Sequence, residues 1–303
     1  MPRKKKVVTV TLGIPVYNEQ ENIQLLVRRL LAQKRTGWKL DRILIISDGS
    51  TDNTIKEIRA VRSQYVELLH YRKRTGQNNR LNELFRKNTS DVIVVLEGDT
   101  IILQDDFIDQ LVSPFAKKKT PDLVFADSKP LASDQMSLVE QALYHFELSK
   151  HRGFKESGLP LYLMNSTRAI RGSVVKSITI PSDVPEDSWI YFHLIRHNLT
   201  CVLQENAVIY FKMPGNTTDH IYKSLKYRTS KGSLRQYLPK SLVDQQYALP
   251  FNHTCMIALR FILHKPFLAL VYLYLSVCAF AVSIVRPRFN PLWNISKSTK
   301  KLV

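Results

Sequence analysis

The sequence predicts an α/β fold built on a parallel sheet, followed by an apolar helix near its C-terminal end. Short apolar runs rich in β-branched residues alternate with amphipathic segments between residues 7 and 96, which is the pattern of βαβ units. Polar clusters directly follow three of these runs. Residues 266–285 contain no charged side chain, and about 20 apolar residues suffice for a helix to span a bilayer. Because parallel sheets bind ligands at the carboxyl ends of their strands, the polar clusters are the candidate site.

Each predicted strand is short and continuously apolar, as expected for strands that helices cover on both faces. The strands are predicted at residues 7–14, 42–46, 66–71, 91–96 and 123–127. Between them, apolar residues recur at helical spacing, for example at Ile23, Leu26 and Leu30, which is typical of a helix with one buried face. The helices are predicted at residues 21–33, 54–63, 79–87, 137–150 and 187–197.

Composition excludes several classes of protein and requires an anionic partner. Hydrophobic residues make up 44% of the chain and charged residues 23%, which argues against disorder, collagen and coiled coil. The three cysteines are far apart and form no CxxC pair, so we expect a reducing compartment rather than a disulfide scaffold or zinc ribbon. The net charge of +18 calls for nucleic acid, an anionic membrane surface or a phosphorylated substrate.

The three polar clusters lie at predicted strand ends. They are residues 15–19 (Pro-Val-Tyr-Asn-Glu), 47–54 (Ser-Asp-Gly-Ser-Thr-Asp-Asn-Thr) and 97–99 (Glu-Gly-Asp). Each cluster alone is compatible with an ordinary turn or helix cap, but three in succession indicate a binding site. The carboxylates of Glu97 and Asp99 are oxygen ligands of the kind that Mg²⁺ or Mn²⁺ prefers when it bridges phosphate oxygens.

These clusters resemble the motifs of the family 2 glycosyltransferases, which are inverting enzymes of the GT-A fold. Residues 14–19, 47–54 and 97–99 carry the resemblance, which continues through residues 185–189 (Pro-Glu-Asp-Ser-Trp). It covers residues 7 to about 190. The resemblance implies a Rossmann-like domain that binds a nucleotide-sugar and a metal-dependent transfer of the sugar to an acceptor hydroxyl, either lipid-linked or on a glycan.

The resemblance also implies roles for individual residues. Asp99, together with Glu97, would hold Mg²⁺ or Mn²⁺ on the diphosphate, and Asp187 would be the general base. Asp48 would bind the base or ribose of the nucleotide. The other residues implied in binding the nucleotide-sugar flank the nucleoside or form a glycine-containing basic loop, and they are Pro15, Tyr17, Glu19, Arg74, Gly76 and Gln77.

Three departures from the family pattern keep other interpretations open. Ser47 replaces the first acid of the second motif, and Glu97 replaces the usual aspartate. The Gln-x-x-Arg-Trp signature of processive synthases is absent, and the nearest stretch, residues 228–237, contains no Trp. A catalytically inactive nucleotide-sugar-binding protein is therefore an alternative. A basic nucleic-acid-binding protein is another, but no recognisable binding motif supports it, and we expect no nucleic-acid partner.

The C-terminal part predicts attachment to a membrane. We expect residues 1–240 to form the catalytic domain and residues 241–303 to form a membrane-associated segment around the apolar helix at 266–285. Basic residues lie on both sides of this helix, so the positive-inside rule leaves open whether it spans the bilayer, re-enters it or lies on its surface. The predicted location is the cell membrane, with the catalytic domain facing the cytosol.

Overall fold

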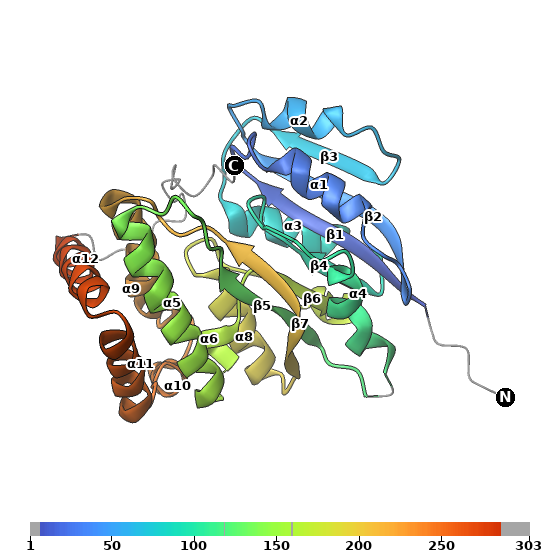
Figure 1. Ribbon diagram of the computed structural model, residues 1–303. Helices are drawn as coiled ribbons and strands as arrows, with labels where there is room; N and C mark the ends of the chain where they lie inside the picture. The colour runs from blue at the N-terminus through green and yellow to red at the C-terminus, as the bar shows by residue number, and fades with distance from the viewer. Residues whose placement is uncertain (1–6, 118, 159, 286–303) are drawn as a thin grey trace. The chain divides into compact units, whose positions relative to one another are not determined.

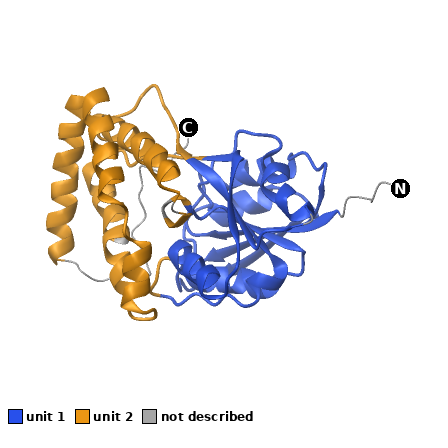
Figure 2. Ribbon diagram, turned by 90° about the horizontal axis from the view of Figure 1, so that it is seen from below, with its two compact units in different colours: residues 1–128, 164–182, 186–209 blue, residues 129–163, 183–185, 210–303 orange. Residues whose placement is uncertain are grey.

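The computed structural model describes residues 7–117, 119–158 and 160–285, and Figure 1 shows their course. The chain forms two compact units (Figure 2). Unit 1 comprises residues 1–128, 164–182 and 186–209, and unit 2 comprises residues 129–163, 183–185 and 210–303. These units reflect packing, and the functional boundary predicted at residue 240 stays a prediction. Residues 1–6 and residues 286–303, which include the basic residues that follow the predicted helix at 266–285, lie outside the described residues.

The described strands form one seven-stranded sheet in the order β3-β2-β1-β4-β6-β5-β7. Its first part is parallel, because β1 pairs in parallel with β2 and β4, and β2 pairs in parallel with β3. This confirms the predicted parallel arrangement. The four parallel strands are β1 (Val8–Val16), β2 (Trp38–Asp48), β3 (Val66–Tyr71) and β4 (Val92–Val95).

The second part of the sheet contains antiparallel pairs, which the sequence analysis did not predict. Strand β6 (Arg168–Arg171) pairs antiparallel with β4 and with β5 (Leu123–Pro130), so the sheet is mixed. The sequence did not predict β6 or β7 (Cys201–Phe211). The reason is physical: β6 is only four residues long with an arginine at each end, and β7 carries polar residues in its middle, so neither shows a continuous apolar run.

Helices cover both faces of the parallel part. Alternate β1 residues, including Leu12 and Ile14, share one apolar cluster with α1 (Ile23–Leu31) and α4 (Phe107–Val112). On the other face Gly13 lies against Leu84 of α3 (Gln77–Lys87). Burial of each large aliphatic side chain contributes roughly 1.5–3 kcal/mol. The remaining helices of unit 1 are α2 (Thr54–Ala60), η1 (Ser113–Ala116), α7 (Gly172–Val175) and α8 (Glu186–Arg196).

Unit 2 is helical. It contains α5 (Leu138–Ser157), α6 (Pro160–Leu163), α9 (Thr217–Leu234), α10 (Lys240–Gln246), α11 (Phe251–His264) and α12 (Pro266–Val285). Helices α11 and α12 both pack on α5, and α12 also packs on α9. The rings of Phe146 on α5 and Tyr272 on α12 stack with centroids 3.8 Å apart. The structure confirms the predicted helix at 266–285, whereas the sequence did not predict α11.

Helix α12 has two different faces. Leu268, Leu275 and Ala279 are buried against unit 2, while Leu270 and Leu273 are 66% and 59% exposed. Helix α11 continues this apolar surface with Leu259 and Leu263. Among the described helices, α12 alone is long and apolar enough to cross a membrane, and 17% of its most apolar window is buried.

Candidate active site

The turns that follow β1 and β2 are bonded to each other. The Asn18 side chain accepts a hydrogen bond from the Thr51 N–H at 2.8 Å, and the Glu19 N–H donates to the Thr54 hydroxyl at 2.7 Å. Asn18 has a φ of 54°, a left-handed conformation that Asn tolerates better than most residues. These bonds hold the first two predicted motifs together at the carboxyl edge of the sheet.

The loop of residues 72–76, which joins β3 to α3, reaches the same edge. The Arg74 guanidinium lies 3.9 Å from the centroid of the Tyr17 ring, a cation–π contact. Two residues predicted from separate parts of the sequence are therefore in direct contact.

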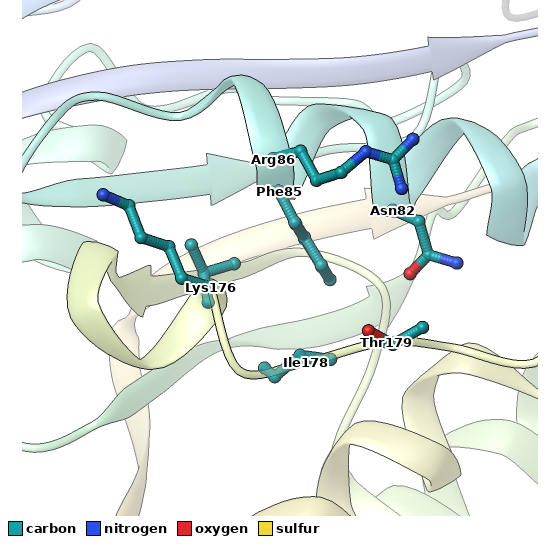
Figure 3. A pocket seen from close by; sticks show the side chains of 7 residues that line it. Asn82, Phe85, Arg86, Lys176, Ile178 and Thr179 are labelled. Atoms are coloured by element: carbon teal, nitrogen blue, oxygen red, sulfur yellow. The ribbon is translucent and has the colours of Figure 1, made fainter.

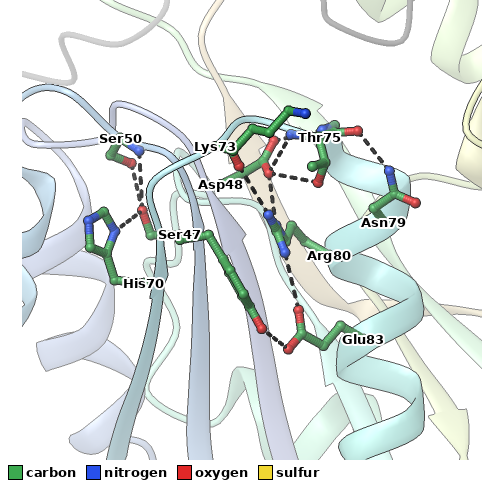
Figure 4. A network of polar contacts seen from close by, with 11 residues as sticks. Ser47, Asp48, Ser50, His70, Lys73, Thr75, Asn79, Arg80 and Glu83 are labelled. Atoms are coloured by element: carbon green, nitrogen blue, oxygen red, sulfur yellow. Dashed lines mark hydrogen bonds and ion pairs between the residues drawn. The ribbon is translucent and has the colours of Figure 1, made fainter.

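Asp48, the last residue of β2, is bonded to the 72–76 loop (Figure 4). Its Oδ1 accepts from the Thr75 N–H at 2.9 Å and the Thr75 hydroxyl at 3.2 Å, and its Oδ2 accepts from the Gly76 N–H at 2.8 Å. Oδ1 also accepts from Nε of Arg80, at 2.8 Å. Asp48 is 4% exposed and Arg80 is 7% exposed, so this ion pair is buried.

Further contacts surround this ion pair (Figure 4). Arg80 donates to Glu83 at 3.3 Å and to the Lys73 carbonyl at 3.2 Å, and its guanidinium lies 3.8 Å from the centroid of the Tyr71 ring. The Tyr71 hydroxyl donates to Glu83 at 2.5 Å, and this bond raises the pKa of Tyr71. Ser47 takes no part in these charged contacts, because its hydroxyl bonds to Ser50 at 3.0 Å and lies 3.3 Å from Nδ1 of His70.

The predicted metal ligands lie in a tight turn after β4. The turn closes between Glu97 and Thr100 through the Thr100 N–H to the Glu97 carbonyl and the Glu97 N–H to the Thr100 hydroxyl, both at 3.1 Å. Gly98 packs so closely on Glu19 that an added Cβ would lie 2.6 Å from the Glu19 Cγ. The Gln77 amide donates to the Glu97 carboxylate at 3.4 Å. This turn therefore contacts both the first motif and the start of α3.

The acidic turn is compatible with a divalent cation that takes part of its ligands from the protein and the rest from a substrate and water. Glu97 and Asp99 supply two hard oxygen donors on either side of one glycine, and both residues are partly exposed. Among the described residues, no group of three or more His, Cys, Asp or Glu side chains gathers to hold a metal. Mg²⁺ and Mn²⁺ accept such incomplete protein sites, since substrate phosphates and water supply the remaining ligands.

Asp187 lies in the first turn of α8, where its Oδ1 accepts from the Ser188 N–H at 2.6 Å. Arg168 of β6 connects it electrostatically to the metal turn. Burial lowers the pKa of this fully buried guanidinium, and the negative charges of Glu186, Asp187 and Glu97 oppose that shift by raising it. Arg168 donates to the Asn165 carbonyl at 3.1 Å. Carboxylates from two separate elements therefore act electrostatically on one buried guanidinium.

Contacts therefore link most of the predicted site residues: Tyr17 with Arg74, Asp48 with Gly76, Gln77 with Glu97, and Glu19 with Gly98. Pro15 differs, since it is buried within β1 opposite Ile46. The roles implied for all these residues stay predictions. The sequence analysis missed Arg80 and Arg168. No sequence signal identified either residue, because Arg168 begins a four-residue strand that has an arginine at each end, and Arg80 is a lone arginine on a helix.

A separate pocket of about 230 Å³ lies between α3 and residues 175–179 (Figure 3). It is lined by Phe85, Ile178 and Val175, with Asn82, Arg86, Lys176 and Thr179 supplying polar groups. None of the predicted site residues lines it. The candidate active site is therefore the polar edge of the sheet and not this pocket.

One curated relative matches a limited part of the chain. It is the undecaprenyl-phosphate 4-deoxy-4-formamido-L-arabinose transferase of Yersinia enterocolitica, which is 28% identical over 102 residues. These residues are 33% of this chain and 31% of the relative, so the match spans about a third of that protein's length.

Solved structures share the fold. The mannosyltransferase PcManGT from Pyrobaculum calidifontis, in complex with GDP-Man and Mn²⁺, has a TM-score of 0.57 at 15% identity, over 92% of this chain and 76% of that one. The glucosyl-3-phosphoglycerate synthase of Mycobacterium tuberculosis, with Mn²⁺, uridine-diphosphate and phosphoglyceric acid, has a TM-score of 0.51 at 14% identity, over 80% of each chain. TarS from S. aureus has a TM-score of 0.51 at 16% identity, over 79% of this chain and 69% of that one. Likeness at such low identity shows the fold alone, and it confirms the predicted GT-A fold.

The family model described as glycosyl transferase family 2 matches residues 11–176. The match spans more than half of the chain and contains the three motifs at the ends of β1, β2 and β4. The chain therefore belongs to the family 2 glycosyltransferases, and the protein is a transferase.

Proposed function

We propose that the protein is a metal-dependent inverting glycosyltransferase that moves a sugar from a nucleotide-sugar to the hydroxyl of a lipid-linked or glycan acceptor at a membrane. The observation that carries the proposal is the set of contacts joining the ends of β1, β2 and β4 and the start of α3 at one sheet edge. These contacts gather the residues implied in binding the nucleotide-sugar and the two metal ligands within unit 1.

The nucleotide-sugar binds at the end of the site that contains Tyr17 and Arg74. Tyr17 provides an aromatic face, and Arg74 provides a fixed positive charge beside it. Pro15 and Glu19 flank the nucleoside, and Gly76 and Gln77 approach it at the start of α3, where the helix N-terminus favours negative charge. Asp48 belongs to the same end of the site. A cationic side chain and a helix N-terminus both favour the binding of a nucleoside diphosphate.

Glu97 and Asp99 are the residues that would hold Mg²⁺ or Mn²⁺. When bound, the cation neutralises the charge that develops on the departing diphosphate. The Mn²⁺ in the PcManGT and glucosyl-3-phosphoglycerate synthase structures supports this assignment in proteins of the same fold.

Asp187 is the proposed general base. It takes the proton of the acceptor hydroxyl as the acceptor oxygen attacks the anomeric carbon and the nucleoside diphosphate leaves from the opposite side, which inverts the configuration. The negative charges of Asp187 and Glu97 both act on the buried Arg168 guanidinium, which supports placing the two carboxylates in one site.

The exposed apolar surface of α11 and α12 is the proposed membrane contact. Monomeric soluble proteins seldom expose apolar patches of more than a few hundred Å², and both helices carry large exposed apolar side chains. A relative that is named as an undecaprenyl-phosphate transferase supports a lipid-linked acceptor. The three described cysteines are free, which suits a catalytic domain that faces the reducing cytosol.

A screen of nucleotide-sugars tests this function. Purified protein in lipid vesicles is incubated with each nucleotide-sugar and with Mn²⁺ or Mg²⁺, and the release of nucleoside diphosphate is measured with and without lipid extract. We expect one nucleotide-sugar to turn over only with a divalent cation, and turnover to rise with the extract. Binding without turnover would favour an inactive nucleotide-sugar-binding protein. Salt-sensitive binding of nucleic acid without any nucleotide-sugar binding would favour the basic nucleic-acid-binding alternative.

A further inference from the structure

We propose that Asp48 and Arg80 together anchor the 72–76 loop, and that Asp48 does not read the nucleobase itself. The inference rests on the proposed function, because it concerns how the nucleotide-sugar site is held. It makes Arg80 a positioning residue and changes the role that the family resemblance implies for Asp48.

The Asp48 carboxylate is buried and is engaged by donors of the chain itself. An ionised carboxylate offers about four acceptor positions, and four donors engage it here: the Thr75 N–H, the Thr75 hydroxyl, the Gly76 N–H and Arg80 Nε. Three of these donors bond to Oδ1 and one to Oδ2. With Asp48 only 4% exposed, the side chain presents almost no surface to a ligand.

The Arg80 guanidinium bonds to three separate groups. Each nitrogen of its guanidinium has a different partner: Nε bonds to Asp48, Nη1 to Glu83 and Nη2 to the Lys73 carbonyl. The guanidinium also lies over the Tyr71 ring. One planar group thus joins the end of β2, the backbone of the 72–76 loop and the body of α3. A lysine carries the same charge but lacks this fixed fork.

The turn after Asp48 also packs closely on the 72–76 loop. Gly49 has a φ of 77°, and an added Cβ would lie 2.9 Å from the Arg74 nitrogen and 3.1 Å from the Arg72 carbonyl oxygen. The loop backbone therefore lies directly on this turn. Side-chain bonds from Asp48 and Arg80 and backbone packing at Gly49 all fix the conformation of the loop that carries Arg74.

It follows that the loop is ordered before the nucleotide arrives, which lowers the entropy lost on binding. The inference predicts that loosening the anchor weakens every nucleoside diphosphate alike, since each would meet the same disordered loop. A base-reading Asp48 predicts instead that its substitution changes the preference between bases.

The test uses the full chain and three variants. Asp48→Asn keeps the shape of the side chain, and Arg80→Lys keeps its charge. Arg42→Lys is the matched control, because Arg42 lies earlier on β2 and also pairs with a glutamate, Glu67 at 2.8 Å, and with a backbone carbonyl, that of Lys87. The affinities for UDP and GDP are measured with Mn²⁺, and amide hydrogen exchange at Thr75 and Gly76 is measured without ligand.

We expect both affinities to fall at least about tenfold in Asp48→Asn and Arg80→Lys, with their ratio kept within about threefold of the unmodified chain. Exchange at Thr75 and Gly76 should accelerate in both variants and not in Arg42→Lys. A changed UDP to GDP ratio in Asp48→Asn alone would overturn the inference, as would unaltered exchange and affinity in Arg80→Lys. If the unmodified chain binds no nucleoside diphosphate, the proposed function fails, and hydrogen exchange alone decides whether Arg80 anchors the loop. Should Asp48→Asn not fold, Arg80→Lys carries the same test.

Discussion

Unit 1 buries charged side chains at one edge of its sheet, whereas unit 2 exposes large apolar side chains along α11 and α12. In unit 1, Asp48, Arg80 and Glu83 are each less than one tenth exposed, and each has a charged partner within 3.3 Å. In unit 2, Leu263 and Leu270 are 70% and 66% exposed. Both arrangements invert the usual distribution of residues in a globular protein.

The buried charges of unit 1 and the exposed apolar side chains of unit 2 differ in what surrounds them. Burying a charge costs several kcal/mol unless paired groups offset it, and unit 1 supplies those groups itself from neighbouring elements. The apolar surface of unit 2 has no such cover among the described residues, and this exposure is the basis of the membrane contact proposed above. The charged side chains of unit 1 are therefore paired within the chain, whereas the apolar side chains of α11 and α12 are exposed.

The largest expected effect breaks the chemistry of unit 1. We expect Asp99→Asn to lower metal-dependent turnover by about a thousandfold. The substitution removes a carboxylate ligand of the cation, and the cation stabilises the negative charge that develops in the transition state by several kcal/mol. Initial rates over a range of Mn²⁺ concentrations measure this. Asp105→Asn, which changes an exposed aspartate of the same unit, serves as the control. An Asp99→Asn enzyme with the normal rate and the normal metal dependence would remove Asp99 from the site.

The next effect concerns the apolar surface of unit 2. Leu270→Glu places a charge on the exposed face of α12, and a carboxylate in hydrocarbon costs roughly 2.5–3.5 kcal/mol, so binding to anionic vesicles should fall about fiftyfold or more. Leu103→Glu, at a leucine of unit 1 that is 54% exposed, should leave binding unchanged. Equal loss in both variants would contradict a specific membrane surface. A truncation before Arg260 is less informative, since it removes Phe261 and Leu268 from the unit 2 core.

Two glycines allow the packing around a turn to be compared between the two units. Gly49 in unit 1 and Gly158 in unit 2 both have positive φ, 77° and 65°, but only Gly49 has backbone atoms near the position of a Cβ. We expect Gly158→Ala to destabilise by about 1 kcal/mol through strain alone, and Gly49→Ala by about 2–3 kcal/mol through strain and close contact. Urea unfolding measures both changes. Equal changes would mean that the turn at Gly49 is not tightly packed on the 72–76 loop.

We also expect a pH dependence of stability in unit 2. Burial, with help from Lys223 and Arg228, lowers the pKa of His220 from 6.5 to about 4. As pH falls below 6.5 the unfolded chain binds this proton first, so the free energy of unfolding should decrease between pH 6.5 and 4. His220→Gln should flatten this part of the profile, and His264→Gln, at an exposed histidine of the same unit, should not. An identical slope in both variants would assign the acid sensitivity elsewhere.

Much of the parallel sheet could be predicted, because strands buried on both faces leave continuous apolar runs. The antiparallel β6 could not, since its four residues begin and end with arginine and it is held by pairing with β4 and β5. Helix α11 was missed because polar residues interrupt its first turns, and its burial depends on contact with α5.

In the site, the residues within recognisable motifs could be predicted, and their supporting residues could not. Arg80 resembles any surface arginine in the sequence. Its burial follows from Asp48 and Tyr71, which approach it only after β2, β3 and α3 have packed. A motif reports the types of residue a site needs, but the contacts that hold them come from tertiary structure.

Asp187→Asn is the sharpest test of sugar transfer by the polar site of unit 1. The affinity for the nucleotide-sugar identified in the screen and the rate of transfer to the acceptor are measured on the same preparation. We expect the affinity to stay within about threefold and transfer to fall at least about a hundredfold, because the amide cannot take the acceptor proton. Unaltered transfer, or a collapse of nucleotide-sugar affinity, would contradict the role of Asp187 as the general base.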